Sequence, residues 1–344
     1  MRRSLGSCGA VVLAVLAAGP VVDAADVPKP RARQLEYDAD TGQWLEAEPP
    51  VPGTPEGDLS LARRDLAREK YRRAHSRIKK WLKAYSPEEA LYADALLLRA
   101  EVEIARGDYY KALKHLEEFL DQYGHTELAP RARTFEFLVA EVFLSGKRRK
   151  WLGMRLFKAT DKGVEVLDEL SAAFPESELA EEALKTKADF YFRQGDFTLA
   201  EMEYARLVDD HPRGQWTRYA MRRSAEAALA SFGGIDFDDA PLIEAEERFG
   251  LYLAQYPGSA EQEGIGQILQ QIHAQRAAKE CSVGNYYART GHPRAAAFYY
   301  RSTFQNWPAT IAATEARRGL TRLGEADERP EGEPPTETTA ESNS

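Results

Sequence analysis

The chain has 344 residues, of which 43% are hydrophobic and 29% are charged, so it can bury a large apolar core. Its net charge is −9, but seven acids and one arginine fall in the last twenty residues, 325–344. The remainder is nearly balanced in charge. This balance argues against nucleic acid as the main partner.

The first residues have the pattern of an export signal. Two arginines are followed by the apolar run "AVVLAVLAAG" and by the small-residue cleavage site "VDA". The run is short for a membrane span, so residues 1–24 are predicted to be a signal peptide and the chain to be exported. The sequence "LGSC" loosely resembles a lipoprotein box, which leaves two alternatives for Cys8: lipidation, or a small residue within the signal. Cleavage after Ala24 would leave Cys281 alone, without an intrachain disulfide.

Residues 25–58 contain six prolines and are predicted to be an extended linker. An irregular helical unit follows, with apolar residues at mainly helical spacing between Leu61 and Leu82. Interspersed acids make the cations of residues 63–83 most consistent with a solvated helix face.

A frame of eighteen residues then recurs along the chain. It reads "GDYYKALKHLEEFLDQYG" at 107–124, "GDFTLAEMEYARLVDDHP" at 195–212 and "GHPRAAAFYYRSTFQNWP" at 291–308. Each copy has Gly first and Ala sixth and follows a helix-length segment. Glycine allows the left-handed turn that ends one helix, alanine allows close helix packing, and proline ends the second helix. Tyr204 and Tyr300 are expected to fill the space where the next helix packs.

Two further units fit this frame with insertions. They end at Pro175 and Pro257 and carry about twelve and about six extra residues. Residues 259–290 are too long for one ordinary helix, so either an extra helix precedes the last repeat or one helix is extended, with Gly264 and Gly266 as a break.

These patterns predict an all-α fold for residues 59–324. The expected architecture is an α-α superhelix of about five helical hairpins, each packing only on its neighbours. No segment has the strict alternation of a half-buried strand. Residues 325–344 are predicted to be an acidic disordered tail.

Motifs for chemistry are missing from the sequence. No two of the six histidines have ligand spacing, and there is no phosphate-binding glycine loop, nucleophile elbow or paired-cysteine site. We therefore predict no catalytic residue, no metal and no cofactor, and a chain that is not an enzyme. The aspartates of "GGIDFDDAP" (233–241) suit calcium less well than a solvated insertion loop. Cys281 is expected to be a buried small apolar residue.

The first insertion includes the basic segment "KRRKWLGMRLFKATDKG", residues 147–163. Trp151, Met154 and Phe157 lie among its cations and are candidates for contact with an anionic membrane surface or a partner helix. The alternative is that the apolar residues cover the neighbouring repeat while the cations stay solvated.

The recurring frame resembles the tetratricopeptide repeat. The small residues Ala100, Ala188 and Gly284 lie seven positions before the turn glycines, as that family requires. The resemblance implies a groove lined by the first helix of each unit. The groove candidates for partner binding are Asp94, Leu97, Glu101, Glu182, Lys185, Asp189, Arg193, Asn285 and Arg289. For each of them the alternative is ordinary solvated surface.

The last two repeats resemble the BamD family of outer-membrane-protein assembly lipoproteins. The run "GNYYARTGHPRAAAFYYR", with Gly291, Ala295, Ala296 and Arg301, stands where that family has its characteristic sequence. The resemblance implies a non-enzymatic scaffold at the periplasmic, inner face of the outer membrane. Its expected partners are the periplasmic domains of a β-barrel insertase and unfolded outer membrane proteins.

This chain departs from that family at its N-terminus, because the best cleavage site has no cysteine after it. A different exported repeat adaptor, serving envelope constriction or cell-wall synthesis, is the alternative function.

Overall fold

The computed structural model describes residues 35–38, 43–46, 51–146, 148–151 and 154–324. The chain divides into two compact units, Met1–Pro52 and Gly53–Ser344. The predicted signal peptide 1–24, including Cys8, and the predicted tail 325–344 lie outside the described residues, and those assignments stay predictions.

The first unit contains a small antiparallel hairpin. Strands β1 (Leu35–Asp38) and β2 (Gln43–Glu46) pair with Leu35 opposite Glu46. These two strands lie within residues 25–58, the segment expected to be an extended linker. Each strand has only four residues, which is too short for a clear alternating pattern.

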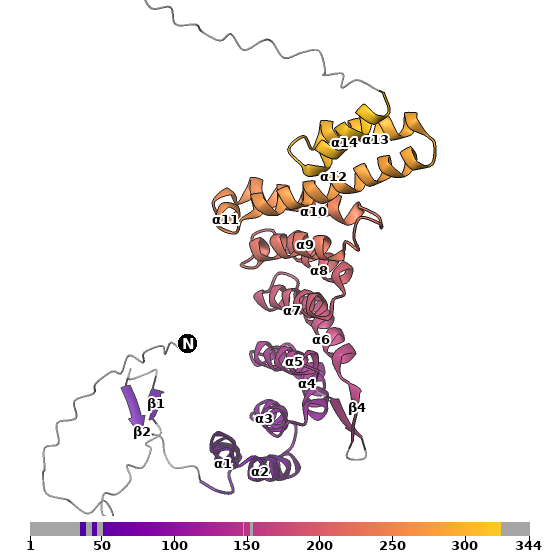
Figure 1. Ribbon diagram of the computed structural model, residues 1–344. Coiled ribbons are helices and arrows are strands. Elements are labelled where there is room, and N and C mark those ends of the chain that lie inside the picture. The colour runs from indigo at the N-terminus through magenta and orange to yellow at the C-terminus, as the bar shows by residue number, and fades with distance from the viewer. Residues whose placement is uncertain (1–34, 39–42, 47–50, 147, 152–153, 325–344) are drawn as a thin grey trace, which may run out of the picture. The chain divides into compact units, whose positions relative to one another are not determined.

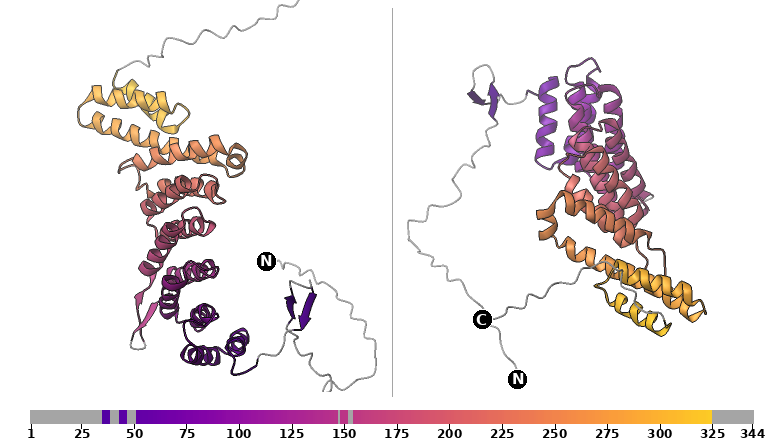
Figure 2. Two further views of the ribbon diagram at one scale, coloured as in Figure 1. Left: turned by 180° about the vertical axis from the view of Figure 1, so that it is seen from behind. Right: turned by 90° about the horizontal axis from the view of Figure 1, so that it is seen from above.

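The second unit is helical, and its helices pack side by side in chain order (Figures 1 and 2). This confirms the predicted all-α, tetratricopeptide-like fold. Over the described residues the helices form six antiparallel pairs, where about five were expected, with α11 and α14 in addition. The pairs are α1–α2, α3–α4, α5–α6, α7–α8, α9–α10 and α12–α13. The bounds are α1 Pro55–Ala67, α2 Tyr71–Ala84, α3 Tyr92–Ala105, α4 Tyr109–Tyr123, α5 Ala129–Leu144, α6 Thr160–Ala173, α7 Glu178–Gln194, α8 Phe197–Asp210, α9 Thr217–Ser231, α10 Ala240–Gln255, α11 Pro257–Gln262, α12 Ile265–Arg289, α13 Pro293–Asn306 and α14 Ile311–Arg322.

The glycines of the recurring frame make the turns within the hairpins. Gly107, Gly195 and Gly291 have φ angles of 75°, 85° and 79°, a left-handed conformation that side chains disfavour. The small residues at the predicted crossing points are buried, as are Tyr204 and Tyr300. The glycines of the frame therefore form turns, and its small residues and tyrosines pack between helices, as their spacing predicted.

The apolar core is divided into clusters along the stack. Each cluster draws its buried residues from a few consecutive helices, beginning with α1–α3 around Trp81 and ending with α12–α14 around Tyr300. A hairpin in this unit therefore buries its apolar side against its sequence neighbours, which is the packing mode of repeat proteins.

The two predicted insertions take different forms. The first contains strands β3 (Arg148–Trp151) and β4 (Met154–Lys158), an antiparallel hairpin with Trp151 opposite Met154 between α5 and α6. The sequence pattern gave no indication of these two short strands. The second is the loop between α9 and α10, residues 232–239.

The long segment 259–290 was expected to contain either an extra helix or one extended helix, and it contains both. A short extra helix, α11, precedes α12, and α12 itself is extended to 25 residues. Gly264 separates them with a φ angle of 70°. The predicted break is therefore confirmed at Gly264, whereas Gly266 lies inside α12.

The Tyr300 ring is held between two helical glycines. A Cβ atom would lie 2.8 Å from this ring at Gly284 in α12 and 2.6 Å from it at Gly319 in α14. Both separations are shorter than carbon atoms tolerate, so only glycine allows α12 and α14 to approach the Tyr300 ring this closely.

We expect Gly284→Ala to lower the free energy of unfolding by about 1–3 kcal/mol, because the added methyl overpacks this contact. Gly250→Ala in α10 is the matched control, since a Cβ there meets no atom within 4 Å. Alanine has the better helix propensity, so the control should gain about 0.5–1 kcal/mol. Urea unfolding of the two variants measures both effects; equal effects would show that the α12–α13 crossing is misplaced.

Glu136 of α5 is a buried carboxyl, 6% exposed. Burial raises its pKa to about 7, against the opposing charge of Arg133, whose Nη1 lies 3.9 Å from Oε2. The folded protein therefore favours the protonated form of Glu136, and the unfolded chain releases its proton at lower pH. Because the unfolded chain ionises Glu136 more readily than the folded protein does, the free energy of unfolding falls as the pH rises from about 4.5 to about 7.

We expect Glu136→Gln to remove this loss. Relative to the variant, the native chain should lose on the order of 3 kcal/mol of unfolding free energy between pH 4.5 and 7.5, since one pKa unit corresponds to about 1.4 kcal/mol. Chemical unfolding of both proteins across this range measures the difference. Parallel pH profiles would mean that Glu136 is ionised in the folded state.

Candidate functional site

A hollow of about 540 Å3 lies where three helices of the first repeats meet. Its lining residues come from α1, α3 and α5 and are Arg63, Leu66, Ala67, Asp94, Leu98, Glu101 and Arg131. Three of these lining residues are apolar, two are cations and two are carboxylates. A hollow of this composition suits an extended peptide with both apolar and charged side chains.

The rim charges are paired across neighbouring repeats. Arg63 of α1 binds Asp94 of α3, and Arg131 Nη2 of α5 lies 3.0 Å from Glu101 Oε2 of α3. The two arginines are about half exposed and the carboxylates 30% exposed. Exposed pairs contribute only about 0–1 kcal/mol each, so a partner's charges can replace them at little cost.

Of the three predicted groove residues of α3, two line the hollow and one is buried in the core. Asp94 and Glu101 line the hollow, as the repeat register indicated. Leu97 was wrongly placed on the open face: it is 2% exposed and packs in the core cluster with Phe119 and Ala132. Helices α4 and α5 cover it. The sequence analysis missed Arg63 and Arg131, because the frame assigned groove positions only within the regular repeats.

The predicted residues of α7 serve mainly to tie repeats together. Glu182 accepts a hydrogen bond from Trp216 Nε1 at 2.6 Å. The Lys185 ammonium lies 3.2 Å from Asp189 Oδ2 and 4.7 Å from the centre of the Trp216 ring. Only Arg193, in the last turn of α7, is exposed.

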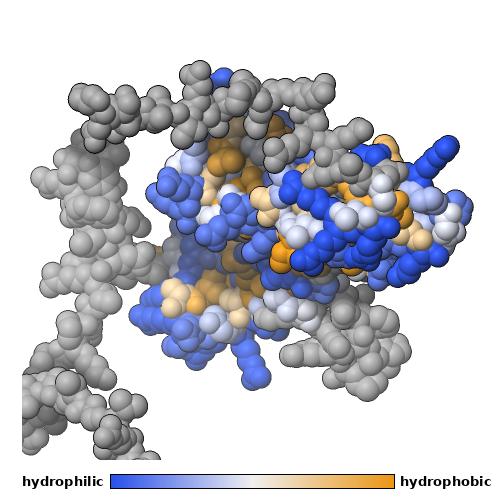
Figure 3. Space-filling model, turned by 45° about the horizontal axis from the view of Figure 1, so that its top comes forward, coloured by the Kyte–Doolittle hydropathy of each residue, from blue (hydrophilic) through white to orange (hydrophobic). Residues whose placement is uncertain are grey.

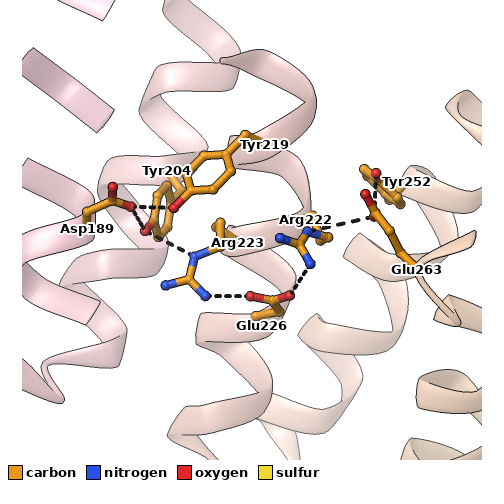
Figure 4. A network of polar contacts seen from close by, with 8 residues as sticks. All are labelled: Asp189, Tyr204, Tyr219, Arg222, Arg223, Glu226, Tyr252 and Glu263. Carbon is orange, nitrogen blue, oxygen red and sulfur yellow. Dashed lines mark hydrogen bonds and ion pairs between the residues drawn. The ribbon is translucent and has the colours of Figure 1, made fainter. Parts of the chain in front are cut away.

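Asp189 is the first member of a polar network that runs from α7 to Glu263 beyond α11 (Figure 4). It accepts hydrogen bonds from the hydroxyls of Tyr204 in α8 and, at 2.8 Å, of Tyr219 in α9. Burial raises the pKa of both hydroxyls, and the hydrogen bond to the Asp189 carboxylate raises it further. Both phenols therefore remain protonated donors at neutral pH.

Two arginines of α9 extend this network. Arg223 lies with its guanidinium 3.7 Å from the centre of the Phe192 ring and donates to Glu226 at 2.6 Å. Arg222 Nη1 lies 3.2 Å from the other oxygen of Glu226, and Arg222 Nε lies 3.7 Å from Glu263. Glu263 in turn accepts from Tyr252 of α10 at 2.7 Å. The network thus connects the α7–α8 hairpin, the α9–α10 hairpin and the residue after α11 (Figure 4).

Of the two predicted groove residues of α12, one bonds to neighbouring helices and the other is exposed. The Asn285 side chain accepts from the Tyr300 hydroxyl at 2.7 Å and donates to Glu315 of α14 at 2.9 Å. Asn285 therefore fastens the last three helices. Arg289, at the end of α12, is exposed.

Other candidates from the sequence do not form a chemical site. Over the described residues, no three His, Cys, Asp or Glu side chains are placed to hold a metal ion, including those of the 232–239 loop. Cys281 is 2% exposed, and burial raises its pKa to about 11, so it is a buried apolar residue as predicted. Trp151, Met154 and Phe157 lie on β3 and β4, and their contact with a membrane stays a prediction.

The stacked helical hairpins place this chain in the class of helical-repeat proteins. A profile of the outer membrane lipoprotein family (YfiO) matches residues 157–331, and a tetratricopeptide repeat profile matches residues 94–126. The first match covers 175 of the 344 residues, so the chain belongs to the outer membrane lipoprotein family. Within the described residues, no helix is both long enough and apolar enough to cross a membrane.

Several solved structures are similar in part. The C-terminal part of a tetratricopeptide repeat-containing protein from Cytophaga hutchinsonii is 10% identical, with 77% of this chain and 88% of that chain covered and a TM-score of 0.40. A tetratricopeptide repeat protein from Parabacteroides merdae is 12% identical, with 79% and 99% covered and a TM-score of 0.36. The type IV pilus biogenesis factor PilW is 18% identical, with 77% and 99% covered and a TM-score of 0.30. At TM-scores below 0.5, none of these likenesses carries an inference for this chain. No curated protein sequence matches it.

Asp189→Ala should lower the free energy of unfolding by on the order of 3 kcal/mol, because two phenol donors and Lys185 lose a charged acceptor. Arg193→Ala, one turn away on the same helix and exposed, is the matched control and should change stability by less than about 0.5 kcal/mol. Thermal unfolding measures both variants. A small effect at Asp189 would show that this network does not fasten α7 to α9.

Proposed function

We propose that the chain is a non-enzymatic scaffold of the machinery that assembles β-barrel outer membrane proteins. The observation that carries this proposal is the match of residues 157–331 to the outer membrane lipoprotein family. The predicted export signal and the sequence resemblance of the last repeat to the BamD family support it. In this proposal the chain is exported and works at the inner face of the outer membrane.

The two ends of the stack have different roles in this proposal. The hollow between α1, α3 and α5 receives an extended segment of an unfolded outer membrane protein, since it combines apolar lining residues with exchangeable ion pairs. The last helices dock the periplasmic domains of the β-barrel insertase. Arg193 and Arg289 are the exposed members of the predicted groove set outside the hollow.

A pull-down from envelope extract, read by mass spectrometry, tests the proposed function. The tagged chain should recover a β-barrel insertase and outer membrane proteins. Recovery of a cell-wall enzyme without an insertase would support the alternative, an exported repeat adaptor for constriction or cell-wall synthesis. That result would overturn the assembly role and leave the fold unaffected.

The double variant Asp94→Ala, Glu101→Ala tests the hollow. We expect recovery of outer membrane proteins to fall several-fold, while the loss of two exposed ion pairs lowers stability by no more than about 1 kcal/mol each. Asp121→Ala, Glu127→Ala removes the same two types of exposed carboxylate outside the hollow and should keep full recovery. Equal recovery by both double variants would exclude the hollow as the substrate site.

A further inference from the structure

The C-terminal helices and the segment that follows them carry opposite charge. Residues 265–324, which form α12, α13 and α14, contain eight lysines and arginines and only two acids, a net charge of +6. Residues 325–344 contain seven acids and one arginine, a net charge of −6. The basic C-terminal helices are therefore followed directly by an acidic segment of equal and opposite charge.

Four of these cations form what we call the C-terminal basic surface: Arg289, Arg294, Arg318 and Arg322. All four are exposed, and within residues 51–146 and 159–324 none of them takes part in an ion pair. The nearby acid Glu315 already accepts a hydrogen bond from Asn285. Helix C-termini carry about half a negative charge, which leaves about half of the charge of Arg289 and of Arg322 uncompensated.

The geometry of Tyr300 brings these arginines to one end of the helices. Its ring contacts Gly284 of α12 and Gly319 of α14, so these two helices run in register on either side of it. The charges of Arg289 and Arg322 both act on its hydroxyl, lowering a pKa that burial raises. Each is the last residue of its helix.

The acidic segment begins at this same end. Arg294 lies in the first turn of α13, directly after the turn that follows Arg289, and the chain leaves α14 at Leu323 and Gly324. Figure 3 shows this end of the stack toward the viewer, with hydrophilic side chains covering much of it. A segment of twenty residues spans up to about 66 Å when extended, so every arginine of the surface is within its reach.

We propose that residues 325–344 bind back onto the C-terminal basic surface and occupy it. An acidic partner segment must then displace them, so the tail sets a threshold for docking at this end of the stack. The attachment next to Arg322 gives the tail an effective concentration on the order of millimolar, which makes even weak charge pairing effective. This proposal does not depend on the identity of the partner.

The test uses the full chain in two forms and a fluorescent peptide of residues 325–344 as the probe. One form keeps the native tail, and the other has its seven acids changed to Gln or Asn. By fluorescence anisotropy at low salt, the neutral-tail form should bind the peptide roughly tenfold more tightly, because its surface is open. Binding should weaken steeply toward 1 M salt, where the Debye length is only about 3 Å. Equal affinity of the two forms, or no binding to either, would overturn the proposal.

A charge-reversal pair locates the bound peptide. In the neutral-tail form, changing the four arginines of the C-terminal basic surface to Glu should abolish peptide binding. The matched control changes Arg72, Arg73, Lys79 and Lys80 of α2, which are also exposed and without ion pairs among the described residues, to Glu. This control should keep binding within about twofold. Loss of binding in the α2 variant alone would place the acidic segment elsewhere, and helical circular dichroism verifies that both variants are folded.

Discussion

Each helical hairpin of this chain can bury its apolar side only against the hairpins before and after it, and the rest of the structure follows from this constraint. The core is accordingly divided into local clusters, each shared by consecutive helices. Small residues at the crossings decide how closely the helices approach, as Gly284 does beneath Tyr300. Stability in such a stack accumulates from one interface to the next, so a weak interface acts locally.

Polar contacts between neighbouring helices complement this packing. Between α7 and the end of α11, carboxylates alternate with phenols and guanidinium groups across successive interfaces (Figure 4). Most of these groups are partly buried. Asp189 and Glu263 accept hydrogen bonds from other helices, whereas Glu226 binds two arginines of its own helix. Side chains that would otherwise be available to a ligand are thereby engaged in holding the stack. The first repeats differ, because their ion pairs are exposed and surround a hollow.

The fold was largely predictable from the sequence, and the candidate site was predictable only in part. Turn glycines, small crossing residues and Tyr204 are repeated at fixed spacing, so their roles could be read directly. The β-hairpins escaped notice because strands of four or five residues show too little alternation. Spacing also placed Asp189 on the correct helix, but its partner Tyr219 comes from the next repeat, thirty residues later. Periodicity specifies the face of a helix and does not specify what the adjoining helix presents to it, which is why Leu97 was misplaced.

The length of α12 has a mechanical consequence. Its first half packs against α10, where Glu246 binds Arg276, and its second half packs against α13 and α14. This one continuous rod connects the final three-helix bundle with the preceding repeats, beginning at the left-handed break of Gly264. The orientation of the terminal bundle relative to the preceding repeats is therefore determined by this single helix.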